Sequence, residues 1–236
     1  MRTAWGLLLC AAAAYAGDGP FEDGKAAFAE GRYEDAIRAY LEAQQRDGYS
    51  PAVLFHLGSA YASSGDVGRA VLSYERALLL APREGAVREG LEATRKGAGL
   101  EGDLDRGWRE FHRYLTTGEW TWLGLSAAVA LLAVLVFQRK LSRSAIVRLA
   151  GTGFLVVLPA ATAITKHALD RDRAVVVAAT ETDIRVSPFE GAEASGKVRP
   201  GQVVWITRSF DEFVMVKSPR GAAGWIARSS VEPVMP

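Results

Sequence analysis

The sequence has few of the residues from which catalytic sites are usually built. Its 236 residues include a single cysteine, Cys10, and three histidines, His56, His112 and His167, which belong to three different segments. No two of these histidines have the spacing of metal ligands, and the sequence contains neither a G-x-S-x-G nor a Walker A motif. We therefore expect a protein without enzymatic activity, and we expect it to bind neither a metal nor a cofactor.

The sequence also lacks an excess of charge of either sign. Lysine and arginine together number 28, and aspartate and glutamate together number 27, so the formal net charge is +1. A protein that binds nucleic acid normally carries a basic face or stripe, and no face expected here is loaded in this way. We therefore expect no nucleic-acid partner.

The start of the chain has the features of a secretory signal peptide. Arg2 and the terminal amine supply positive charge, residues 7–14 form a short apolar core, and Ala14-Tyr15-Ala16 is a small–x–small cleavage signature. We predict a signal peptide at residues 1–16, with an uncleaved membrane anchor as the alternative. Cleavage would remove Cys10 and leave a mature chain without cysteine, which fits an exported protein that does not use disulfides.

An internal repeat follows the signal peptide. When the sequence is shifted by 34 positions, small and aromatic residues coincide in five pairs: Gly24 and Gly58, Gly31 and Gly65, Ala36 and Ala70, Tyr40 and Tyr74, and Ala43 and Ala77. This period is typical of the tetratricopeptide repeat, in which small residues let two antiparallel helices approach closely. We predict an all-α domain over residues 17–96, made of two repeats (17–50 and 51–84) and a capping helix.

Two repeats are few for a repeat protein. Solenoids usually need about three units for stability, so we expect this domain to lean on a partner, on a second copy of the chain or on the helix that follows it.

The predicted repeats offer a surface for a partner. Repeat arrays of this kind bind extended peptides along a groove lined by the first helix of each repeat. By position in the motif, five side chains would line it: Lys25, Phe28, Phe55, Ser59 and Ala62. The lining is mostly small and apolar, which favours a hydrophobic or mixed partner segment. The alternative is that these residues only pack against the helix of the linker.

The centre of the chain contains two apolar runs that suit a membrane. A spanning helix needs about 20 apolar residues, and neither run has the polar stripe of a soluble helix. We predict a two-helix transmembrane hairpin with spans at residues 120–137 and 149–165, with a pair of buried helices in a soluble core as the alternative. The loop between them, residues 138–148, has four cations and no acidic residue: Arg139, Lys140, Arg143 and Arg148.

Residues 97–119 connect the repeats to the first span. A glycine-rich linker comes first, and an apolar stripe then recurs at helical spacing: Trp108, Phe111, Tyr114 and Leu115. This juxtamembrane helix either lies in the membrane interface or docks on the repeats as another cap. The signal peptide and the positive-inside rule together place the basic loop in the cytoplasm and both folded parts outside it.

The C-terminal part of the chain, residues 173–236, has the pattern of a small all-β domain. Six short β-rich runs alternate with glycine and proline turns: AVVVAA, TDIRVS, VVWITR, EFVMVKS, AGWIAR and VEPV. The segments IRVSP, SGKVRPGQVV and GAAGWIARSSVEPV resemble characteristic segments of bacterial SH3-type domains, and this resemblance implies an SH3-like barrel. Its candidate ligand contacts are aromatic: Phe189, Trp205, Phe210, Phe213 and Trp225. For each of them a position in the barrel core is the alternative, and Trp225 in particular would lie in the core or at its mouth.

The order of these parts resembles the BatE family of the bacterial aerotolerance operon. The resemblance is carried by that order and by the tryptophan-rich segment WREFHRYLTTGEWTWLGL before the first span. It implies a multidomain protein of the bacterial inner membrane with its repeats and its SH3-like domain on the periplasmic or outer side. It also implies partners among membrane proteins, including von Willebrand A-domain proteins and a MoxR-type ATPase system.

These observations lead to two functional hypotheses. In the first, the chain is a non-catalytic, membrane-anchored scaffold that binds partner proteins through its repeats and its SH3-type domain. In the second, it is an envelope sensor whose SH3-type domain binds a cell-wall peptide or glycan.

Overall fold

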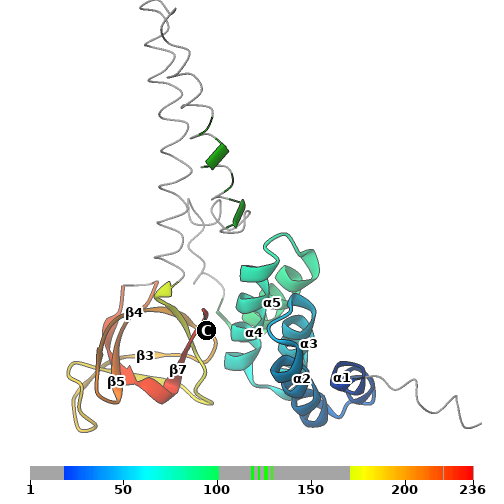
Figure 1. The fold of residues 1–236 in the computed structure, drawn as a ribbon. Helices are drawn as coiled ribbons and strands as arrows, with labels where there is room; N and C mark the ends of the chain where they lie inside the picture. Colours follow the sequence, from blue (N-terminus) through cyan, green and yellow to red (C-terminus); the bar gives the residue numbers. More distant parts are fainter. Residues whose placement is uncertain are drawn as a thin grey trace, which may run out of the picture.

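The computed structural model describes residues 19–100, 171–219 and 221–235, together with isolated positions between 118 and 129. These residues form five helices, here called the helical repeats, followed by one antiparallel sheet, here called the β domain (Figure 1). The predicted signal peptide, the loop 138–148 and the predicted span 149–165 lie outside the described residues, as do most of the predicted span 120–137 and most of the linker. Among the described residues, no helix is both long and apolar enough to cross a membrane.

The five helices follow the predicted pattern of two pairs and a final helix. They are α1 (Pro20–Ala29), α2 (Tyr33–Asp47), α3 (Pro51–Ser64), α4 (Val67–Leu80) and α5 (Gly85–Gly97). Side-chain caps and a glycine fix several of the helix ends. The side chain of Ser50 accepts a hydrogen bond from the backbone nitrogen of Val53, and that of Asp66 accepts one from Arg69, which caps α3 and α4. Gly65 ends α3 in the left-handed conformation, with φ at 89°, which glycine adopts readily.

The period of the repeat reappears in the packing of the helices. A Cβ atom on Gly24 would lie 2.5 Å from the Tyr40 ring, and one on Gly58 would lie 2.9 Å from the Tyr74 ring. The first helix of each repeat therefore approaches the second through a glycine that faces a tyrosine. Ala36 and Ala70, which occupy equivalent positions in the two repeats, are both completely buried.

The β domain is a seven-stranded antiparallel sheet. Its strands are β1 (Arg173–Val176), β2 (Thr182–Arg185), β3 (Ala194–Val198), β4 (Val203–Phe210), β5 (Phe213–Lys217), β6 (Ala223–Ala227) and β7 (Val231–Pro233). Their order across the sheet is β3-β2-β6-β5-β4-β1-β7. Six of these strands lie largely in the β-rich runs predicted from the sequence. The strand outside them, β3, lies at an edge of the sheet and is mostly exposed, so its sequence ASGKV lacks the alternation of a half-buried strand.

The sheet curls so that all seven strands contribute to one core (Figure 1). The buried side chains of this core are Ala174, Val176, Ile184, Val198, Val204, Val214, Val216, Ile226 and Val231. The described part of the chain therefore contains a small β domain with its own interior.

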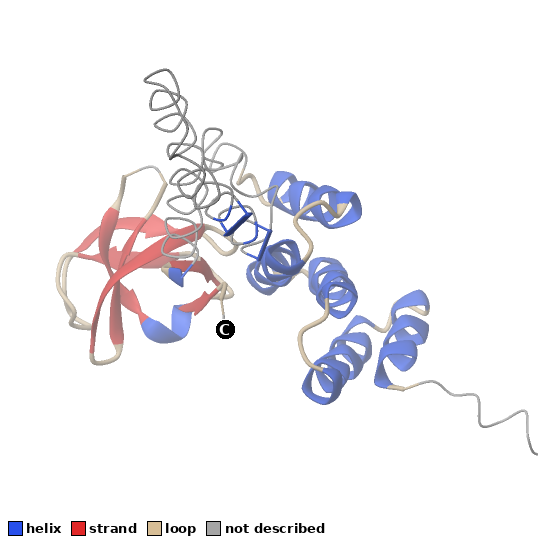
Figure 2. Cartoon of the chain, turned by 45° about the horizontal axis from the view of Figure 1, so that its top comes forward, coloured by secondary structure: helices blue, strands red, loops and turns tan. Residues whose placement is uncertain are grey.

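The helical repeats and the β domain are in direct contact. Helix α4 lies nearest to the sheet and α1 lies farthest from it, as both views of the chain show (Figures 1 and 2). Strand β1 is buried on both faces, because Ala174 and Val176 point into the β-domain core while Val175 packs into the core of the helical repeats. The helical repeats thus pack against the β domain, a support that the sequence did not lead us to expect.

Candidate protein-interaction surfaces

The first candidate surface lies on the first helices of the two repeats. Phe55, Ser59 and Ala62 recur at helical spacing along one side of α3 and are half-buried. Lys25 and Phe28 occupy the equivalent positions of α1, which packs against α3, so the structure brings the five predicted residues to neighbouring helices. Lys25 is exposed and forms an ion pair with Glu22 at 2.8 Å. We call these five residues the repeat surface.

An aromatic cluster that sequence reasoning missed joins the two repeats beside this surface. The ring of His56 lies edge-on to Phe21 and to Phe55, with both centroid distances at 5.3 Å, and it stacks on Tyr40 at 5.6 Å. Burial lowers the pKa of His56, and the positive charge of Lys25 lowers it further, so the neutral ring is favoured. The signal was present in the sequence, because Phe21 and Phe55 are a further pair that the repeat period brings into coincidence.

The tyrosines of the two repeats differ in their hydrogen bonds. The hydroxyl of Tyr74 lies 3.1 Å from the side-chain oxygen of Ser59. In the first repeat Lys25 takes the place of Ser59, and the buried hydroxyl of Tyr40 has no hydrogen-bond partner in the described part of the chain. Burial raises the pKa of Tyr40 to about 12. The first repeat therefore retains the tyrosine ring for packing without the hydrogen bond that accompanies it in the second.

This difference gives a paired prediction for stability. Tyr74→Phe should lower the free energy of unfolding by about 1 kcal/mol, because it removes the hydrogen bond with Ser59. Tyr40→Phe should leave the free energy unchanged or raise it, because the ring is kept and a buried hydroxyl without a partner is removed. Urea unfolding of the two variants measures this difference. Equal losses in both would contradict the assignment of the two hydroxyls.

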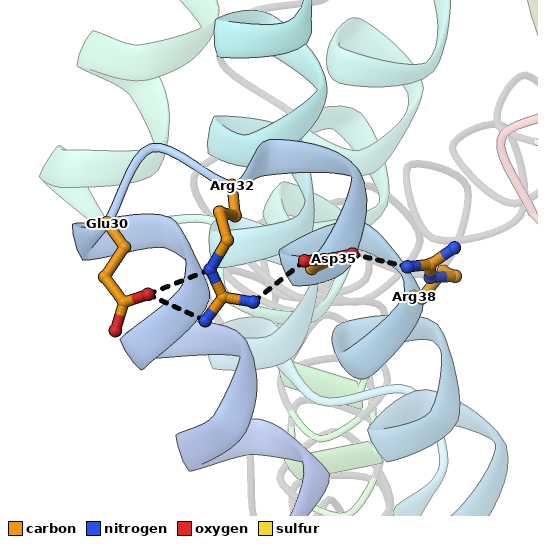
Figure 3. Close-up of polar contacts among 4 residues, drawn as sticks. All are labelled: Glu30, Arg32, Asp35 and Arg38. Atoms are coloured by element: carbon orange, nitrogen blue, oxygen red, sulfur yellow. Dashed lines mark hydrogen bonds and ion pairs between the residues drawn. The ribbon is translucent and has the colours of Figure 1, made fainter.

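The turn between α1 and α2 carries a chain of exposed ion pairs. Glu30, Arg32, Asp35 and Arg38 contact one another in this order, with charges of alternating sign (Figure 3). The hydrogen bond from Arg32 lowers the pKa of Asp35. Because all four side chains are exposed, water screens these pairs and they contribute little to stability. This is a solvated surface, not a pair of carboxylates arranged for acid–base chemistry.

The second candidate surface lies on the outer face of the β domain. In β6, Gly224 and Ile226 are buried, whereas Trp225 between them is half-buried and lies on the opposite face of the strand, outside the buried core of the β domain. The ring of Trp225 meets that of Phe210 edge-on, with 6.4 Å between centroids. Phe189 is 63% exposed and Phe210 is 55% exposed, which is unusual for side chains of this size.

Arg185 connects these residues across the sheet. It lies opposite Trp225 in the pairing of β2 with β6, and its guanidinium donates a hydrogen bond of 2.9 Å to the carbonyl oxygen of Phe189. Phe213 lies opposite Phe210 at the end of the β4–β5 hairpin. We call Phe189, Phe210, Phe213 and Trp225 the aromatic patch. The remaining predicted aromatic residue, Trp205, is paired with Arg173 and Lys217 and stands apart from the patch.

A third surface, the junction between α4 and the β domain, was not predicted from the sequence. A Cβ atom on Gly68 would lie 2.8 Å from the carbonyl oxygen of Val176 and from the Cα of Val177, so the α4 backbone touches the backbone at the end of β1. Val203 and Val234 join Val175 in the core of the helical repeats. The junction is therefore a continuous apolar contact.

Two consecutive charged residues of α4 complete the junction. Arg76 contacts the carboxylate of Glu232 at 2.8 Å and the carbonyl oxygens of Pro233 and Val234 at 2.9 and 3.3 Å. The carboxylate of Glu75 is 1% exposed and accepts hydrogen bonds from Arg95 of α5 at 2.6 Å and from Arg173 of β1 at 2.8 Å. The charge of Glu75 is thus paired within the protein and not with water.

The described residues do not form a site that could hold a metal ion. No group of three or more histidine, cysteine, aspartate or glutamate side chains comes together among the residues that the structure places.

Comparison with known proteins identifies one part of the chain. No curated protein and no solved structure matches the sequence. The sequence profile described as Tetratricopeptide repeat matches residues 53–87, which contain most of α3, all of α4 and the start of α5. The prediction of a tetratricopeptide repeat is confirmed for this segment, whose relatives are typically protein-interaction modules without catalytic activity.

Proposed function

We propose that this chain is a non-catalytic, membrane-anchored scaffold of the bacterial envelope that binds partner proteins. The observation that carries the proposal is the tetratricopeptide repeat at residues 53–87. Its second helix, α4, is covered by the β domain, whereas Phe55, Ser59 and Ala62 of its first helix remain partly accessible. The side of the repeat that is open is therefore the side with which such repeats bind extended segments.

The β domain supplies the second binding surface of the proposal. Its size, its antiparallel strands and its single interior are compatible with an SH3-type barrel, and its aromatic patch lies on the outer face. Flat aromatic rings beside an arginine suit a protein segment. Following the resemblance to the BatE family, we place both domains on the periplasmic or outer side of the inner membrane. By the same resemblance, the partners include von Willebrand A-domain proteins and a MoxR-type ATPase system.

A pull-down from solubilised membranes after crosslinking in cells tests the scaffold. Ala62→Arg places a long charged side chain on the repeat surface and should reduce recovery of a protein partner at least tenfold, since a central contact contributes about 2 kcal/mol or more. Arg38→Ala, which alters only an exposed ion pair of α2, is the control and should recover the partner like the wild type. Unchanged recovery with Ala62→Arg would contradict binding through the repeats.

The exposure of Phe189 and Phe210 favours one alternative function, a sensor that binds cell-wall peptide or glycan through the β domain. The same pull-down separates the two. Recovery of wall material that is lost in Phe210→Ala and kept in Ala62→Arg would support the sensor. Loss of protein partners in Ala62→Arg would support the scaffold.

A further inference from the structure

The helical repeats and the β domain share one buried carboxylate. Glu75 lies on α4, and its two oxygens are divided between two parts of the molecule: Oε1 accepts from Arg95 of α5, and Oε2 accepts from Arg173 of β1. All three side chains are largely buried, with exposed fractions of 1% for Glu75, 8% for Arg95 and 11% for Arg173. The two arginines thus share one carboxylate.

The position of α5 is linked in turn to the repeat surface. A Cβ atom on Gly90 would lie 2.9 Å from the ring of Tyr74, so α5 packs directly on that tyrosine. The hydroxyl of Tyr74 lies beside the side chain of Ser59, a member of the repeat surface on α3. A continuous series of contacts therefore leads from the repeat surface through Tyr74 and α5 to Glu75, and from there to β1.

We propose that Glu75 couples the position of α5 to the docking of the β domain. The docked β1 strand stabilises α5 in its observed position, and α5 in that position stabilises the docking of β1. A buried carboxylate is costly unless its charge is compensated, and here the compensation is shared by two guanidinium groups. If β1 moves away, it uncovers Glu75 to water as it withdraws Arg173, and the ion pair of Glu75 with Arg95 of α5 is then screened and weakened. By linkage, a displacement of α5 weakens the docking of β1 by the same factor. The coupling lies within the chain and does not depend on the identity of any partner.

Hydrogen–deuterium exchange of the purified full chain in detergent tests the coupling in both directions. Arg173→Gln should raise the exchange rates of the α5 amides, residues 85–97, at least about fivefold. Arg95→Gln should raise those of β1, residues 173–176, by a similar factor. If each change affected only the element that carries the substitution, the coupling would be overturned.

A control variant and a conservative variant complete this experiment. Arg69→Gln removes an exposed ion pair with Asp66 on the same helix, α4, and should leave the exchange of both α5 and β1 at the wild-type rate. Arg173→Lys keeps the positive charge but loses the forked geometry, so it should have a smaller effect on α5 than Arg173→Gln. Faster exchange in β1 of Arg173→Lys with no change in α5 would also overturn the proposal, even if Arg173→Gln did not fold.

Discussion

Glu75→Gln is expected to lower the free energy of unfolding of the full chain by about 3–5 kcal/mol, which is the usual cost of removing one partner of a buried ion pair. The amide has nearly the size of the carboxylate, so the loss arises from charge and not from a cavity. It replaces the carboxylate that Arg95 and Arg173 share by a neutral amide, of which only the oxygen can accept a hydrogen bond. Denaturant unfolding followed by circular dichroism measures the change.

The matched control is Glu30→Gln on the α1–α2 turn. Glu30 also forms an ion pair with an arginine, Arg32, but both side chains are exposed (Figure 3). This variant should unfold close to the wild-type midpoint, because water already screens the pair. Equal midpoints for Glu30→Gln and Glu75→Gln would show that the buried carboxylate does not hold the junction together.

Gly68→Ala is expected to destabilise the junction although alanine is the better helix former. Alanine normally stabilises a helix by up to about 1 kcal/mol relative to glycine. At position 68, however, the added Cβ atom would lie 2.8 Å from backbone atoms of Val176 and Val177, which cannot rotate out of the way. We expect a net loss of about 1–3 kcal/mol, typical of an overpacked interior, together with faster proteolysis between the helical repeats and the β domain.

The control for this prediction is Gly85→Ala at the start of α5. Apart from its chain neighbours and the backbone of its own helix, no atom of the described residues lies within 4 Å of the position that its Cβ atom would take, so the helix propensity should act alone. Unfolding experiments on the two variants should therefore give changes of opposite sign. A stabilising effect of Gly68→Ala would mean that α4 and β1 are not in close backbone contact.

The sequence predicted the local elements well, since local patterns determine them. The repeat period matched Gly24 with Gly58 and Tyr40 with Tyr74, and in each repeat the glycine packs on the tyrosine in the structure. The strands were visible from short β-rich runs, except for the exposed edge strand β3. What the sequence could not settle was which face of a strand is covered. In the β6 sequence AGWIA both alternating sets of side chains are small or apolar, so the sequence alone fits an outward or an inward Trp225.

The junction could not be predicted because none of its contacts is local in the sequence. Glu75 is separated from Arg173 by 98 residues, and Arg76 from Glu232 by 156. Within α4, Glu75 is indistinguishable from an ordinary surface glutamate until the β domain is placed beside it. The uninterrupted apolar run of residues 174–179 was a partial signal, because a strand that is covered on both faces has no polar alternation.

The central claim is that the repeats and the β domain form one docked unit, and a distance measurement by pulsed electron paramagnetic resonance tests it most directly. Spin labels at Glu42→Cys of α2 and Lys217→Cys of β5, both exposed, would be introduced in a Cys10→Ser background of the full chain. We predict a single narrow distance distribution that broadens when Gly68→Ala or Glu75→Gln is added. A broad distribution in the otherwise unaltered chain would contradict the docked unit.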